Sequence, residues 1–70
     1  MDLRLFDSWC DGRWSARQVW DGEVPAMGEL VDERLHTLAQ EWPGVGEAEL
    51  LPHAQAWASG WLSVANGGVK

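Results

Sequence analysis

Residues 9–22, WCDGRWSARQVWDG, decide the fold of the amino-terminal part of this 70-residue chain. The Asp11-Gly12 dipeptide is typical of a two-residue β-hairpin turn, because a type I′ turn needs positive φ at both of its central residues. Such a turn places Trp9 opposite Trp14 at a non-hydrogen-bonded pair, where cross-strand side chains lie closest together. This segment therefore predicts a tryptophan-rich hairpin.

The predicted hairpin spans residues 1–22, and alternate residues share one face of its pleat. One face carries most of the large apolar side chains and is expected in the core. Its residues are Leu3, Leu5, Asp7, Trp9, Trp14, Ala16, Gln18 and Trp20. A competing interpretation is a helix over residues 15–20 with Ser15 as its N-cap. That alternative would give an all-α three-helix protein.

The sequence after the hairpin predicts an acidic helix over residues 25–42. Pro25 is a preferred first-turn residue, and the Pro43-Gly44 pair ends the helix. Its apolar residues recur at helical spacing, with Leu30 at the edge of an arc formed by Met27, Val31, Leu35, Leu38, Ala39 and Trp42.

A second helix is predicted over residues 52–66, because Pro52 would interrupt a helix that began at Glu47. It contains no Asp, Glu, Lys or Arg, and residues 67–70 form a short tail. Its apolar stripe is Leu51, Ala54, Trp57, Ala58, Trp61, Leu62 and Ala65. The predicted fold class is thus α+β, a β-hairpin followed by two antiparallel helices (ββαα), in one small domain over residues 1–70.

Composition bounds the function. The chain has a net charge of −6, six Trp and a single cysteine, Cys10, so no internal disulfide can form. Neither a signal peptide nor a membrane-spanning run is recognisable, so we expect a cytoplasmic protein that does not enter a membrane. The acidic balance argues against direct nucleic-acid binding and favours a partner protein with a basic surface.

No catalytic motif is recognisable, and we expect no enzyme, no catalytic residues, no metal ligands and no cofactor. Neither histidine stands in a nucleophile–base pattern with a Ser or Cys. Glu33 and His36 have the three-residue spacing of half a carboxylate-bridged di-metal site, so a small metalloprotein is a remote alternative. A solvated acidic helix face explains the same residues more simply.

Arg34 lies within the apolar arc of the first predicted helix, and a buried arginine must be paired. We expect it to pair with Asp7 of the hairpin or with a carboxylate of a partner protein. The alternative is that its aliphatic stem runs along the surface and its charged head stays in water. The residues predicted to bind a partner are Trp9, Trp14, Glu29, Asp32, Glu33 and Arg34.

The second predicted helix has an outer face of small uncharged residues, whereas an exposed helix normally carries Lys, Glu or Arg. Small residues at helical spacing let another backbone approach closely. We expect this face to pack against a second copy, in a homodimer, or against another protein: Ala56, Ser59, Gly60 and Ser63.

These features together favour a small acidic protein-binding protein, an inhibitor or adaptor of phage or bacterial type. It would act by covering a basic surface of its target. The alternative is a constitutive small subunit of a larger complex, in which the uncharged helix is permanently covered.

Overall fold

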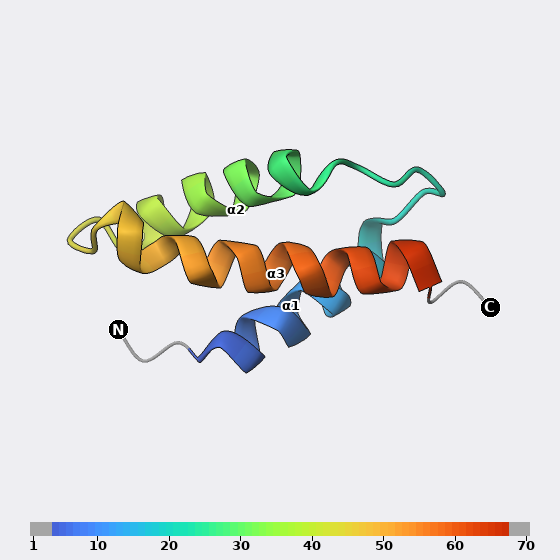
Figure 1. Cartoon of the computed structure of the whole chain (residues 1–70), viewed down its shortest axis with the longest axis horizontal. Helices are drawn as coiled ribbons and strands as arrows, with labels where there is room; N and C mark the ends of the chain where they lie inside the picture. Colours follow the sequence, from blue (N-terminus) through green and yellow to red (C-terminus); the bar gives the residue numbers. More distant parts are fainter. Residues whose placement is uncertain (1–3, 68–70) are drawn as a thin grey trace.

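The computed structural model describes residues 4–67 and forms three helices, with no strand in that range. They are α1 (Leu5–Val19), α2 (Met27–Glu41) and α3 (Glu47–Gly67) (Figure 1). Helices α1 and α3 run in the same direction, and α2 runs in the opposite direction (Figure 1). Both shorter helices pack on α3, and no Cα atom of α1 comes within 8 Å of a Cα atom of α2.

The predicted β-hairpin, and with it the α+β (ββαα) fold class, is wrong. A continuous helix runs through Asp11 and Gly12, and the all-α three-helix alternative fits the structure. The predicted turn needs positive φ, but among the described glycines only Gly22 has it (φ 103°). Trp9 and Trp14 therefore lie about 140° apart around a helix instead of facing each other. The predicted core position Leu3 lies outside the described residues.

Gly12 lies inside a helix, where it allows the backbones of α1 and α3 to pack closely. A Cβ atom added at Gly12 would overlap the carbonyl oxygen of Trp57 and stand 3.0 Å from the amide nitrogen of Trp61. Ser8, Gly12 and Ala16 are all buried and follow one another at intervals of four, so they form one narrow ridge of small residues along α1. This ridge allows the backbone of α1 to rest directly on α3.

Gly60 makes the reciprocal contact from α3. A Cβ atom added there would overlap the carbonyl oxygen of Trp9 and lie 3.2 Å from its Cα atom. Each helix thus contributes a glycine at the point where it meets the other helix's backbone. Neither glycine can be replaced without moving the two helices apart.

The core consists of two clusters of buried residues along α3. At the carboxyl-terminal end of α3, both shorter helices contribute buried residues to the first cluster: Ala16, Leu30, Trp57, Ala58, Trp61, Val64 and Ala65. At its amino-terminal end, α2 and α3 form the second cluster: Leu38, Leu50 and Ala54. The predicted apolar stripe of the second helix is confirmed at five positions, all buried: Ala54, Trp57, Ala58, Trp61 and Ala65.

Helix α3 begins five residues earlier than predicted and includes Pro52. Proline cannot donate a hydrogen bond to the carbonyl of Ala48, but both residues are exposed, so water can satisfy that carbonyl. Leu50 and Ala54, on either side of the proline, are buried against Leu38. Packing on both sides thus holds the helix together. Of the predicted tail, residues 68–70 lie outside the described part of the chain.

We expect Gly12→Ala to lower the free energy of unfolding by about 1–3 kcal/mol, because the new methyl group meets backbone atoms that cannot rotate away. The matched control is Gly28→Ala, since a Cβ atom at Gly28 of α2 meets nothing within 4 Å. This control should leave stability unchanged or raise it by up to about 1 kcal/mol through helix propensity. Urea unfolding followed by circular dichroism measures both, and equal effects would contradict the close contact.

Candidate functional site

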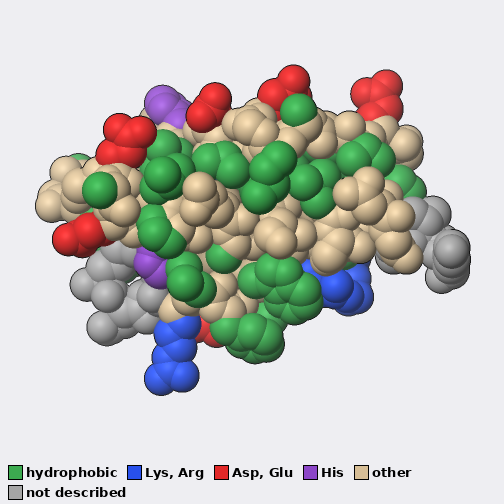
Figure 2. All heavy atoms as spheres, viewed as in Figure 1, with side chains coloured by type: hydrophobic (Ala, Val, Ile, Leu, Met, Phe, Trp, Pro, Cys, Tyr) green, Lys and Arg blue, Asp and Glu red, His purple; other side chains and the backbone are tan. Residues whose placement is uncertain are grey.

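Most acidic side chains lie on the α2 side of the molecule and most basic ones on the α1 side. Eight carboxylates follow Trp20 within residues 21–49, and Arg34 is the single Lys or Arg between Trp20 and Gly67. The other described arginines, Arg4, Arg13 and Arg17, lie on or next to α1. Figure 2 shows acidic side chains along the edge formed by α2 and basic side chains along the edge formed by α1. The α2 side therefore carries a negative field.

Glu29, Asp32 and Glu33, predicted to bind a partner, are all exposed on the outer side of α2. Their spacings of three and four place them next to one another on one helix face. The one ion pair within residues 4–67 joins Asp11 and Arg34, so these three carboxylates have no cationic partner in the described chain. We call them the α2 acidic face.

Glu29 also borders a hollow of about 430 Å³ between the α1–α2 connection and α3. Asp21 and Glu23 stand at the same rim, and Trp61 forms part of the wall. The rest of the wall consists of the last residue of α1, Val19, and three apolar residues of the connection: Val24, Pro25 and Ala26. Two hydrogen bonds shape this connection. The Glu23 amide donates to Asp21 Oδ1 (3.1 Å), and Trp20 Nε1 donates to the Glu23 carbonyl (3.0 Å).

A second hollow of about 320 Å³ lies between α2 and the start of α3. Asp32, His36 and Glu47 supply its polar lining, and four apolar side chains supply the rest: Leu35, Ala39, Val45 and Leu50. The α2 acidic face thus has a residue at each of two hollows, Glu29 at one and Asp32 at the other. Both hollows have carboxylates and apolar side chains in their lining, and the hollow at Asp32 has the more apolar walls. Such a lining suits the aliphatic stem and cationic head of a lysine or arginine side chain.

Glu33 and His36, the remote metal candidates, do not come together with a third ligand. No group of three His, Cys, Asp or Glu side chains able to hold a metal occurs within residues 4–67. His36 Nε2 instead lies 3.1 Å from Gln40 Nε2, and Thr37 donates to the Glu33 carbonyl. Both interactions are local to one helix, as on a solvated surface.

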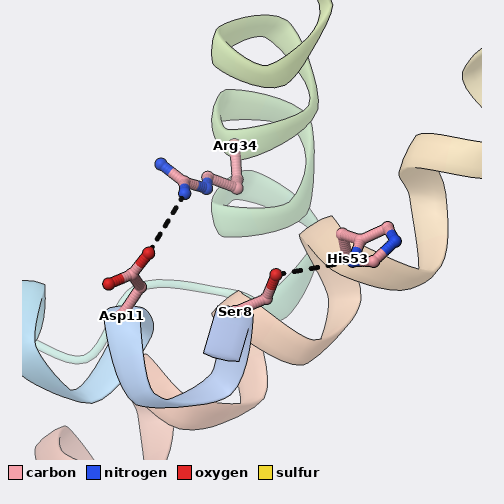
Figure 3. Close-up of polar contacts among 4 residues, drawn as sticks. All are labelled: Ser8, Asp11, Arg34 and His53. Carbon is pink, nitrogen blue, oxygen red and sulfur yellow. Dashed lines mark hydrogen bonds and ion pairs between the residues drawn. The ribbon is translucent and has the colours of Figure 1, made fainter. Parts of the chain in front are cut away.

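Arg34 is half-buried and pairs with Asp11 of α1, not with Asp7 (Figure 3). Its Nη2 atom lies 3.9 Å from Asp11 Oδ2, and its guanidinium carbon lies 5.3 Å from the centroid of the Trp57 ring. Arg34 thus covers Trp57 from the α2 side and joins α2 to α1 across α3. It acts inside the chain and does not belong to the α2 acidic face.

The two tryptophans predicted at a hairpin tip lie along the middle of α1. Trp14 is 65% exposed, whereas Trp9 is partly covered. The Trp9 ring stacks on Phe6 with centroids 6.0 Å apart, and the guanidinium carbon of Arg13 lies 5.0 Å from the ring centroid. Only Trp14 of the two is available as a large free aromatic surface.

The small residues predicted to contact a second copy are used largely within the chain. Gly60 contacts the Trp9 backbone of α1, as described above, and is buried. Ser63 Oγ accepts a hydrogen bond from Arg13 Nη1 (3.0 Å) and donates one to the Gly60 carbonyl (2.7 Å). Ala56 is half-buried and Ser59 is exposed. The close approach that these residues allow is therefore made by α1.

The sequence-based prediction missed the ridge of small residues by which α1 packs on α3. Its signal is the spacing of Ser8, Gly12 and Ala16 at intervals of four, which is a helical pattern and not a strand pattern. The Asp-Gly turn signal obscured it.

No family model, curated protein or solved structure matches this chain. Within residues 4–67, no helix is both long enough and apolar enough to cross a membrane.

We expect Asp11→Asn to change the unfolding free energy by less than about 1 kcal/mol, because its ion pair with Arg34 is long and Asp11 is 62% exposed. Arg34→Ala should cost more, about 1–2 kcal/mol, because it also uncovers the Trp57 ring. Urea unfolding of both variants checks this order. A larger loss for Asp11→Asn would show that the ion pair, and not the cover over Trp57, is the main contribution.

Proposed function

We propose that this protein binds another protein and acts by covering a basic surface on it, as a small non-catalytic inhibitor or adaptor. The observation that carries this proposal is the α2 acidic face. Its three carboxylates are exposed and have no cationic partner in the described chain. Such a field attracts a basic partner and speeds its association.

The two hollows beside this face support the proposal. Charge alone gives attraction with little selectivity, because exposed ion pairs are worth little and are screened by salt. A hollow with apolar walls adds burial of a side-chain stem to the pairing of its charged head. The hollows near Glu29 and Asp32 therefore offer two places where lysine or arginine side chains of a partner would be held.

The same field disfavours a nucleic-acid ligand, since phosphates would be repelled from the side of the molecule that carries most of its charge. The acidic edge can instead take the place of a polyanion on its target. A protein whose basic surface binds an anionic ligand would then lose access to that ligand.

The test is affinity capture from a bacterial lysate followed by titration of the purified captured protein. We expect neutralising the α2 acidic face (Glu29→Gln, Asp32→Asn, Glu33→Gln) to weaken binding by tenfold or more. The matched control removes the same number of charges elsewhere (Asp7→Asn, Glu41→Gln, Glu49→Gln) and should change the affinity far less. Equal losses in both variants, or a captured partner with an acidic surface, would contradict the proposal.

A further inference from the structure

Helix α1 carries a stripe of apolar side chains on the side that faces away from α3. Phe6 is 69% exposed, Trp14 is 65% exposed, and Cys10 between them is also exposed. The intervals of four place these three residues on one ridge, which we call the aromatic stripe. A surface helix normally shows polar side chains here. Two large, mostly exposed aromatic rings on one ridge mark a contact surface.

Charges of opposite sign flank the aromatic stripe. Asp7 and Asp11 each follow a stripe residue by one position and form the next ridge on one side. Arg13 and Arg17 lie on the neighbouring ridge on the other side, in line with Trp9. Within the chain, Asp11 already pairs with Arg34 and Arg13 donates to Ser63, so these two ridge residues are shared between internal and external contacts. Three parallel ridges thus run along α1, in the order acidic, aromatic and basic.

We propose that the aromatic stripe binds the same stripe of a second copy of this chain, with the two α1 helices parallel and related by a two-fold axis along the stripe. In this arrangement the acidic ridge of each copy faces the basic ridge of the other, and the match occurs twice. In the antiparallel arrangement the acidic ridge would face an acidic ridge. The charges therefore select the parallel pair.

The aromatic stripe alone gives a small contact, so we expect a weak and reversible dimer. Phe and Trp side chains bury 150–250 Å² each, so the exposed parts of Phe6 and Trp14 offer roughly 300 Å² per copy. Two copies would cover roughly 600 Å², about half of the area of a small specific interface. The stems of Arg13 and Arg17 and the first turn of α1 extend the contact. We expect association at micromolar concentrations.

This contact is separate from the α2 acidic face. Helices α1 and α2 lie on different sides of α3 (Figure 1), so both acidic faces stay open when two α1 helices meet. Dimerisation and partner binding can therefore succeed or fail independently.

Sedimentation of the full chain over a concentration series tests the contact. The wild type should shift from monomer to dimer, whereas Trp14→Glu and Phe6→Glu should stay monomeric at concentrations at least tenfold higher. The matched control is Met27→Glu, which places the same charge on an exposed apolar residue of α2 outside both hollows and should behave like the wild type. A wild type that stays monomeric, or variants that still dimerise, would overturn the proposal.

The orientation has its own test. Asp7→Arg puts a cation opposite the partner's basic ridge in the parallel pair and should weaken the dimer several-fold. In an antiparallel pair it would face acidic residues and strengthen the dimer, which would overturn the parallel arrangement.

Cys10 gives a second readout because it lies at the middle of the stripe. Diamide oxidises two thiols to a disulfide and is itself reduced to the hydrazine. It should cross-link the wild type at least tenfold faster than Trp14→Glu, and equal rates would count against the contact.

Discussion

The rest of the structure depends on the backbone contact between α1 and α3 at Gly12 and Gly60. Each glycine lies against a main-chain carbonyl of the other helix, so the two helices are as close as their backbones allow. This close contact leaves no room for large side chains between the two backbones. Trp57 and Trp61 of α3 are instead buried in the core cluster shared by the three helices. Arg34 covers Trp57 from the remaining side.

The sequence predicts the part of the fold that follows local rules. The acidic helix expected over residues 25–42 corresponds to α2, Met27–Glu41. The prediction succeeded because the apolar periodicity and the Pro-Gly stop signal of this segment are strong. The hairpin and the start of α3 are wrong for a common reason. Gly12 and Pro52 are both read locally as breaks, but each lies in a helix that is held by packing against residues far away in sequence. Gly12 meets Trp57, forty-five positions later, and no local pattern contains that contact.

The candidate site divides in the same way. The exposure of Glu29, Asp32 and Glu33 follows from charge and helical phase, so it could be predicted. The hollows beside them are formed by the α1–α2 connection and by the first turn of α3, whose positions require the tertiary fold. The position of Arg34 within an apolar arc predicts that its guanidinium needs an anionic partner. The identity of that partner, Asp11, depends on α1 being a helix.

Helix α3 holds the other two helices, yet it is the last of the three to be synthesised. Neither α1 nor α2 can bury its apolar face on the other, since their backbones do not meet. Isolated helices of fifteen residues are marginal in water. Until α3 has been synthesised, α1 and α2 therefore lack the surface on which both are buried. We therefore expect the three helices to fold together once α3 is available, as small single domains usually do.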